Sequence, residues 1–179
     1  MQTVDISIIY ACQRGEQDAF RRIYEAYNQK IYRLIYSYCH DPEEALDLTQ
    51  EVFIRVYTRI ADFRSECSLE TWIYQIAVNT VISAMRKSRF HEQINNQTDK
   101  SEQADVNLEM QELGQHIERS ISMLPESLRM AFMLSAVEGL PYAETGRILG
   151  ISVEAVRMRV SRARQLLRES LQPYMGNEL

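Results

Sequence analysis

Arginines are concentrated in one stretch near the C-terminus, at a spacing that suits the recognition of nucleic acid. Residues 153–168 read VEAVRMRVSRARQLLR and carry Arg157, Arg159, Arg162, Arg164 and Arg168. A guanidinium group can hold a guanine edge or a phosphate through two parallel hydrogen bonds. This density of arginine on one helix therefore favours contact with DNA over the alternative, a solvated basic helix on an ordinary helical bundle.

The residues around this stretch predict a helix-turn-helix over residues 142–168. Gly150 can take the positive φ with which helices commonly end, Ile151 fills the corner, and Ser152 is a favourable N-cap. The residues expected to face inward recur at steps of three and four, and they are Val153, Val156, Val160, Ala163 and Leu167. The outward face carries Arg157, Met158, Ser161 and Arg162, while Arg159 and Arg164 flank it and suit phosphates. We therefore expect the second helix to lie in a DNA groove.

A second group of polar, basic and aromatic residues lies near the middle of the chain. Its members are Asn79, Thr80, Ser83, Arg86, Lys87, Arg89 and Phe90. An amide can read a base edge, an aromatic ring can stack on an unpaired base, and arginines can hold the backbone. Trp72 and Tyr74 could also stack on bases, although Trp72 falls on an apolar stripe and is expected in the core. Taken alone, a helix end with a few basic residues is usually just solvated.

A third candidate surface is acidic. Asp47, Gln50 and Glu51 share one helical face, and we expect an exposed edge of Phe53 beside them. Such a strip could dock on basic or coiled-coil helices of a partner protein, whereas the alternative is a solvated face.

Residue patterns for catalysis or metal binding are poor. Cys39 and His40 are adjacent, but no second Cys or His follows at ligand spacing on the same helix. The sequence contains no glycine-rich phosphate loop and no nucleophile with a matching base. We therefore expect no enzyme activity, no metal and no cofactor.

Composition and charge narrow the class of protein. The chain has 179 residues, of which 45% are hydrophobic, with only 6 Gly and 4 Pro, and this favours an all-α fold. The net charge of −5 counts against a stand-alone DNA-binding protein. Acids gather at residues 41–51 and bases at 86–89 and 157–168, which predicts separate surfaces for a protein partner and for DNA.

The cysteines and the apolar runs indicate where the protein acts. Three scattered cysteines do not form a disulfide framework and point to a reducing compartment, the cytoplasm. The first residues lack a basic start followed by an apolar run, and no apolar run approaches about 18 residues. We therefore expect no signal peptide and no direct membrane insertion.

Apolar periodicity predicts two small helical domains. The first domain, residues 1–91, contains helices starting near Val4, Asp18, Pro42 and Leu69, with Asp18, Asp41 and Ser68 as N-caps and the last helix fading near residues 86–90. Residues 92–112 are rich in acids and amides and predict a flexible linker that spans ~25 Å on average and ~70 Å at most. The second domain, residues 113–179, contains a helix over 113–124, another after Pro125 that ends at 139–141, and the helix-turn-helix.

Five segments of the sequence, in this order, identify a family. They are residues 19–38 (AFRRIYEAYNQKIYRLIYSY), 41–57 (DPEEALDLTQEVFIRVY), 63–87 (FRSECSLETWIYQIAVNTVISAMRK), 124–134 (LPESLRMAFML) and 142–168 (YAETGRILGISVEAVRMRVSRARQLLR). Over about residues 15–170 the chain resembles bacterial sigma factors of the extracytoplasmic-function (ECF) group. The resemblance implies a protein that gives RNA polymerase core its promoter specificity.

The resemblance also implies roles for individual residues. The first domain is similar to conserved region 2, and Asp47, Gln50, Glu51 and Phe53 match its surface for the clamp helices of the largest polymerase subunit. Region 2 melts and reads the promoter −10 element; Asn79 matches the asparagine beside its flipped-base pocket, Arg86 and Lys87 lie on the same helix end, and Ser88, Arg89 and Phe90 fall in the loop that completes the pocket.

The second domain is similar to region 4, which sits on the polymerase flap and reads the −35 element. Arg157, Met158, Ser161 and Arg162 match base-facing positions, and Arg159 and Arg164 match backbone contacts. Many relatives have Gly-Thr where this chain has Glu154-Ala155, so Glu154 could read a cytosine or repel a phosphate. The resemblance further implies control by an anti-sigma factor, and we expect a monomer when free.

Two other classes of protein remain as alternatives. A helix-turn-helix regulator with a helical sensor domain would bind operator duplex tightly without polymerase, as a dimer on a palindromic site. A helical adaptor would bind only protein and would not need Arg157 or Arg162.

Overall fold

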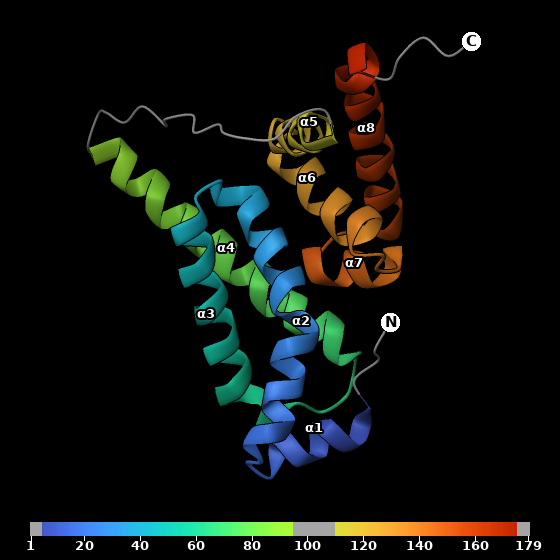
Figure 1. Ribbon diagram of the computed structural model, residues 1–179. Helices are drawn as coiled ribbons and strands as arrows, with labels where there is room; N and C mark the ends of the chain where they lie inside the picture. Colours follow the sequence, from blue (N-terminus) through green and yellow to red (C-terminus); the bar gives the residue numbers. More distant parts are fainter. Residues whose placement is uncertain (1–4, 95–109, 175–179) are drawn as a thin grey trace.

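The helices of the chain form two groups that follow the order of the sequence (Figure 1). The computed structural model describes residues 5–94 and 110–174, without the side chains of residues 88–94, 110–113, 115 and 174. The first domain contains α1 (Ile6–Gln13), α2 (Gln17–Cys39), α3 (Pro42–Arg59), the short η1 (Ile60–Asp62) and α4 (Leu69–Ile94). The second contains α5 (Met110–Ser122), α6 (Glu126–Phe132), η2 (Met133–Val137), α7 (Tyr142–Leu149), α8 (Val153–Leu171) and η3 (Gln172–Tyr174). Throughout the described ranges the structure is helical without β-strands, as the composition predicts.

The first domain is built on α2, α3 and α4, which pack on one another, with α1 across one end of α2. Apolar residues at steps of three and four place one face of each helix in a common core. Its fully buried members include Ile23, Ile31, Leu34, Val52, Val56, Ile73 and Ala77.

The helix starts in this domain largely follow the predicted caps. The carboxylate of Asp41 accepts hydrogen bonds from the backbone N–H of Glu43 (2.8 Å) and Glu44 (2.9 Å), and Pro42 occupies the first helical position. Ser68 Oγ accepts from the N–H of Thr71 at 3.0 Å. Both of these N-caps are confirmed.

The start of α2 differs from the prediction. Gly15 takes a positive φ of 86° and turns the chain so early that α2 begins at Gln17. Glu16 then occupies the N-cap position without a side-chain hydrogen bond. The predicted cap, Asp18, is wrong by two residues and lies in the first turn, where a carboxylate still complements the helix dipole.

The helices on either side of the predicted linker are longer than expected. Helix α4 continues to Ile94 instead of fading near residues 86–90, and α5 begins at Met110. The rest of the predicted linker, residues 95–109, lies outside the described residues, so its flexibility stays a prediction.

In the second domain, α5, α6 and α7 all pack against α8. Leu124, Ala163 and Leu167 form one small buried cluster, and Ala131, Val156 and Val160 form another. Helix α6 continues as the wider π-helical η2 and ends before Gly139, which has a φ of 76°. This confirms the predicted stop at residues 139–141 and lets the chain turn into α7.

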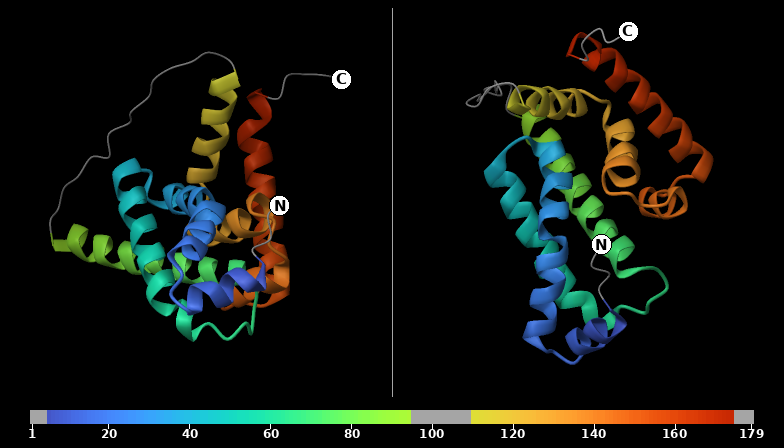
Figure 2. Two further views of the ribbon diagram at one scale, coloured as in Figure 1. Left: turned by 60° about the horizontal axis from the view of Figure 1, so that its bottom comes forward. Right: turned by 45° about the vertical axis from the view of Figure 1, so that its right-hand side comes forward.

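The two domains contact each other (Figure 2). Helix α7 packs along α4, and α5 meets α2. Apolar residues of the second domain join the core cluster of the first, and they are Met130, Met133, Leu134, Leu140 and Ile148. The described helices therefore form one body with a shared apolar interface.

Candidate nucleic-acid and protein interfaces

The turn between α7 and α8 has the predicted geometry. Gly150 has a φ of 65° in the left-handed region, and its N–H donates to the carbonyl of Gly146. Ser152 Oγ accepts from the N–H of Ala155 at 3.1 Å and caps α8. The turn glycine and the N-cap are confirmed.

Gly146 is a turn residue that sequence reasoning missed. A Cβ at this position would lie 2.8 Å from the backbone oxygen of Ile151, so α7 and the turn approach too closely for a side chain. The N–H of Ile151 also donates to the carbonyl of Gly146 at 3.0 Å. The available signal was a second glycine four residues before Gly150, one helical turn earlier.

The predicted two-sided character of α8 is confirmed. Val156, Val160, Ala163 and Leu167 are buried against the rest of the second domain. Arg157, Ser161 and Arg162 are exposed, and Met158 is 73% exposed. Arg159 and Arg164 border the buried stripe from opposite sides, Arg159 half-buried and Arg164 exposed. Helix α8 therefore presents the predicted basic residues to solvent in an arrangement that a DNA groove could accept.

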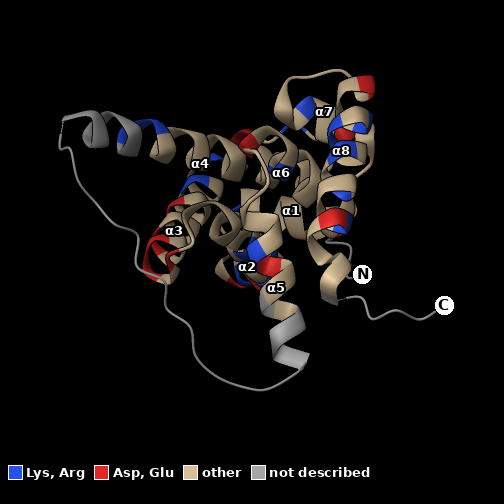
Figure 3. Ribbon diagram, turned by 90° about the horizontal axis from the view of Figure 1, so that it is seen from above, with Lys and Arg blue, Asp and Glu red and all other residues tan. Residues whose placement is uncertain are grey.

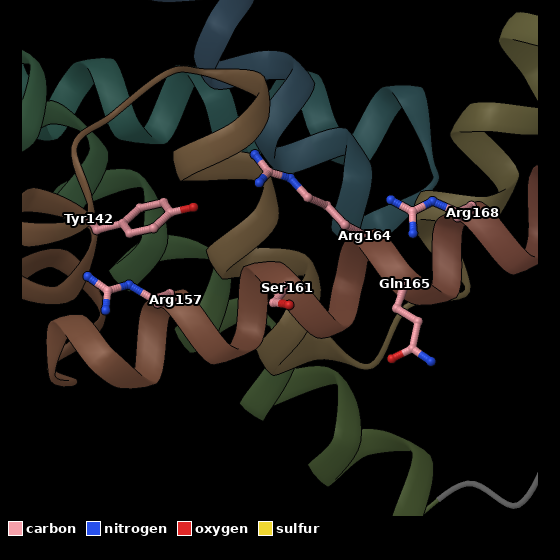
Figure 4. A pocket seen from close by; sticks show the side chains of 6 residues that line it. All are labelled: Tyr142, Arg157, Ser161, Arg164, Gln165 and Arg168. Atoms are coloured by element: carbon pink, nitrogen blue, oxygen red, sulfur yellow. The ribbon is translucent and has the colours of Figure 1, made fainter.

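Part of this basic face forms a pocket of about 420 Å³ (Figure 4). Its lining residues are Tyr142, Arg157, Ser161, Arg164, Gln165 and Arg168. All six carry hydrogen-bond donors and none is acidic, so the pocket suits an anionic group such as a phosphate. Met158, Arg159 and Arg162 lie outside this lining, and Arg162 Nη1 instead donates to Gln165 Oε1 at 2.8 Å.

The prediction did not include Tyr142, Gln165 and Arg168 among the DNA-contacting residues. The signal for Arg168 was its spacing, because residues 157, 161, 164 and 168 follow one another at steps of four, three and four on one helix face. Tyr142 comes from the first turn of α7, and only the folded structure brings it beside Arg157.

Helix α4 carries the second predicted group. Asn79, Ser83 and Arg86 are exposed and share one face, where Ser83 Oγ donates to the carbonyl of Asn79 at 2.7 Å. Lys87 is exposed beside them. Thr80 is buried and donates to the carbonyl of Ile76 at 2.9 Å, so it contributes to packing.

Other expectations for this helix need correction. Ser88, Arg89 and Phe90 belong to the helical backbone of α4 and not to a loop, while their side chains lie outside the described set. Tyr74 is fully buried, which makes base stacking by its ring impossible in this arrangement. Trp72 is half-buried against Phe63, with ring centroids 5.1 Å apart, in agreement with the predicted role in the core.

The acidic face of α3 is exposed at Asp47, Gln50 and Glu51, and Glu51 pairs with Arg55 at 2.5 Å. Acidic positions gather on α3, whereas basic positions lie on α8 and on the C-terminal half of α4 (Figure 3). The predicted separation of charge is therefore present on the folded surface.

The expected exposed edge of Phe53 is wrong. Phe53 is only 4% exposed, because its ring packs edge-on against Tyr24 of α2 with centroids 4.8 Å apart. Large apolar residues elsewhere on α3 are exposed in its place: Leu46 (50%), Ile54 (63%) and Tyr57 (51%). Leu46 and Ile54 lie four residues before and after Gln50, and Tyr57 lies seven residues after it. This helical spacing was the signal for a second, outward apolar stripe on α3.

Among the described residues, no three His, Cys, Asp or Glu side chains are grouped so that they could hold a metal ion. None of the helices in the described ranges is long and apolar enough to cross a membrane.

Comparison with known proteins identifies the family. The models "Sigma-70 region 2" and "Sigma-70, region 4" match residues 23–91 and 115–167. The chain is 31% identical to the RNA polymerase sigma-H factor of Pseudomonas aeruginosa over 97% of each sequence. It is 34% identical to the ECF RNA polymerase sigma factor SigW of Bacillus subtilis, over 89% of this chain and 92% of the relative. The chain belongs to the ECF group of the sigma-70 family.

Solved structures agree with the fold of this ECF sigma factor. It aligns with CnrH, solved in complex with the cytosolic domain of CnrY, at a TM-score of 0.72 and 20% identity over 97% of this chain and 99% of that one. The sigma factor RpoE of Bartonella quintana, solved with the anti-sigma factor NepR, gives a TM-score of 0.72 and 22% identity, covering 86% and 96% of the two chains. Both the family and the all-helical two-domain fold inferred from the sequence are thus confirmed.

Proposed function

We propose that this sigma factor binds RNA polymerase core and directs it to promoters with a −10 and a −35 element. The observation that carries the proposal is the presence of two basic surfaces, on α4 and α8, and an acidic surface on α3, within the matched sigma regions. A stand-alone regulator needs one DNA surface, whereas a bipartite promoter needs two. We assign residues 1–91 to the −10 and core-binding domain, 92–112 to a linker and 113–179 to the −35 domain.

The exposed face of α8 reads the −35 element in this proposal. Arg157, Met158, Ser161 and Arg162 face base edges, and Arg159 and Arg164 hold the DNA backbone. The basic pocket supports a phosphate contact next to Arg157, and Arg168 extends it by one helical turn.

The exposed polar face of α4 reads the −10 element. The exposure of Asn79, Arg86 and Lys87 supports this assignment. Ser88, Arg89 and Phe90 continue the same helix and complete the proposed surface.

Helix α3 docks on the clamp helices of the polymerase through Asp47, Gln50 and Glu51. The exposed side chains of Leu46 and Ile54 add apolar area beside these polar groups, which is the composition of a protein interface. Phe53 supports this surface from below by packing against α2, so its contribution is to hold α3 in place.

Regulation follows the pattern of the relatives in this proposal. CnrH and RpoE were solved with CnrY and the anti-sigma factor NepR, and we assign an anti-sigma partner to this protein as well. The free protein is a cytoplasmic monomer that the polymerase recruits. The net charge of −5 supports dependence on polymerase for DNA affinity.

Gel shifts with and without core polymerase test the proposed function. The free chain is expected to shift promoter duplex weakly, and core plus the chain is expected to give a stable, specific complex. Ile54→Ser is expected to weaken core binding without changing the fold. Arg14→Ala, a change at an exposed residue that follows α1 and lies outside the acidic face of α3, serves as the control. Tight binding of a palindromic duplex by a dimer without polymerase would instead support the regulator.

A further inference from the structure

Three exposed side chains of α8 are joined by hydrogen bonds along one edge of the helix. Arg162 Nη1 donates to Gln165 Oε1 at 2.8 Å, and Gln165 Nε2 donates to Glu169 Oε1 at 2.9 Å. Steps of three and four residues place these side chains on successive turns, where they are within reach of one another. We call these three residues the Arg162 network.

Arg162 differs from the other arginines of α8 in being held by a side-chain partner. Arg157, Arg164 and Arg168 line the basic pocket, and Arg159 borders the buried stripe. Within the described ranges, none of these four forms a side-chain hydrogen bond or an ion pair. Attraction to a phosphate tolerates many directions of approach, whereas a base edge requires a defined orientation of the guanidinium plane. The restraint therefore acts on an arginine whose proposed task depends on orientation.

The orientation of the Gln165 amide is fixed from both ends. A guanidinium group can only donate hydrogen bonds and a carboxylate can only accept them. The amide oxygen must therefore face Arg162 and the amide nitrogen must face Glu169, as observed. Figure 4 shows the Gln165 amide pointing away from Arg164 and Arg168 of the pocket. Without the carboxylate of Glu169, the amide could turn its nitrogen toward Arg162, and two donors would then face each other.

The bond to Gln165 leaves most of the Arg162 guanidinium available. The group carries five N–H donors, and only one of the two on Nη1 is used by Gln165. Nε and Nη2 remain for two parallel hydrogen bonds to the O6 and N7 atoms of a guanine. Gln165 can thus hold Arg162 without competing with a base for the same donors.

We propose that Gln165 and Glu169 are positioning residues that hold Arg162 in the orientation needed to read a guanine of the −35 element. This proposal rests on the proposed function as a sigma factor. Ordering one long side chain on binding weakens an equilibrium by about two- to tenfold. The Arg162 network meets this cost before DNA is bound, so it increases the discrimination at the one base pair that Arg162 contacts.

The test measures base discrimination by the holoenzyme formed from core polymerase and the full-length chain. Each base pair of the −35 element in a selected promoter is changed in turn, and gel shifts give the ratio of the affinities for the original and the changed promoter. Arg162→Ala identifies the base pair that Arg162 reads, because discrimination is lost there. Circular dichroism first establishes that each variant is folded.

Four variants then separate positioning from charge. Gln165→Met keeps the length of the side chain without the amide, and Glu169→Ala removes the acceptor. We expect both to reduce discrimination about two- to tenfold at the base pair read by Arg162 and at no other. Glu169→Gln keeps an acceptor oxygen without the charge, so it should retain the discrimination that Glu169→Ala loses. Gln172→Ala, a change at an exposed glutamine of η3 outside the network, is the control and should change nothing.

A double substitution shows whether Gln165 acts through Arg162. In the Arg162→Ala background, we expect Gln165→Met to have no further effect on discrimination, because the side chain that it positions is absent. An effect that persists in this background would show that Gln165 contacts the DNA directly, and it would overturn the proposal. Equal losses at every base pair of the element would indicate a structural role in α8 and would also overturn it.

The outcomes separate this proposal from the function on which it rests. If the wild-type holoenzyme binds its promoter but Gln165→Met keeps full discrimination, positioning is refuted and the sigma function stands. The same conclusion follows if Arg162→Ala loses discrimination at no base pair, or at a pair where the preferred base on neither strand is guanine. If the wild type fails to direct core polymerase to any promoter, the proposed function itself is refuted.

Discussion

The close approach at Gly146 predicts opposite effects for two glycine-to-alanine substitutions. In a helix, alanine is favoured over glycine by about 1 kcal/mol. At Gly146, however, the new Cβ would lie 2.8 Å from the carbonyl oxygen of Ile151, a backbone atom that cannot move without shifting the turn. Gly114, in α5, is exposed and has nothing within 4 Å of the corresponding Cβ position, so it is the matched control.

The expected change in the free energy of unfolding combines the cost of the close contact with the gain in helix propensity. Overpacking a tight contact costs about 1–3 kcal/mol, and disturbing the hydrogen bond from the N–H of Ile151 to the carbonyl of Gly146 adds about 1 kcal/mol. After the gain in helix propensity, we expect Gly146→Ala to lower the free energy of unfolding by ~1–3 kcal/mol. Gly114→Ala is expected to raise it by about 0.5–1 kcal/mol.

Urea denaturation followed by circular dichroism measures both changes, and binding to a −35 duplex by the same variants reports on the position of α8. The reasoning fails if Gly146→Ala is as stable as Gly114→Ala, because the turn would then have room for a side chain. Loss of −35 binding by Gly146→Ala without loss of stability would show instead that the turn shifts at little energetic cost.

Two other predictions concern DNA affinity and pH. Arg157→Ala and Arg162→Ala should each weaken promoter binding by the holoenzyme by about 1–3 kcal/mol without changing the unfolding transition. The control Arg14→Ala should leave promoter binding unchanged. Equal losses of binding in all three variants would contradict base reading by α8. Burial, chiefly, and Glu70 raise the pKa of Tyr27 to about 12, from about 10 in the unfolded chain. The folded state favours the neutral phenol, so this contribution to stability is complete below pH ~10 and is lost as the pH rises toward 12. Tyr27→Phe should therefore flatten the pH dependence of the unfolding midpoint between these two values. An unchanged slope would refute the assignment.

The local signals of the sequence were sufficient for much of the fold. Asp41, Ser68 and Ser152 cap helices as predicted, since an N-cap depends only on residues within one turn. Gly150 leaves its helix with positive φ for the same local reason. The cap at Asp18 failed because Gly15 turns the chain three residues earlier, so two local signals competed.

The parts that could not be predicted depend on distant residues. Phe53 lies at the border between the buried apolar face and the exposed acidic face of α3. Only the position of Tyr24 on α2 decides that its ring is buried. Likewise, the hydrogen bond between Tyr74 and Glu138 could not be predicted, because the two residues are 64 positions apart and belong to different domains. The exposed positions of α8 were predicted well, since a helix with one apolar stripe has its polar face fixed by the same periodicity.

Transcription from genomic promoter fragments by core polymerase mixed with this protein tests the central claim most directly. We predict discrete run-off transcripts that require the protein and that are lost when either promoter element is changed. The claim would be contradicted if the protein, confirmed as folded, gave no specific transcript from any fragment.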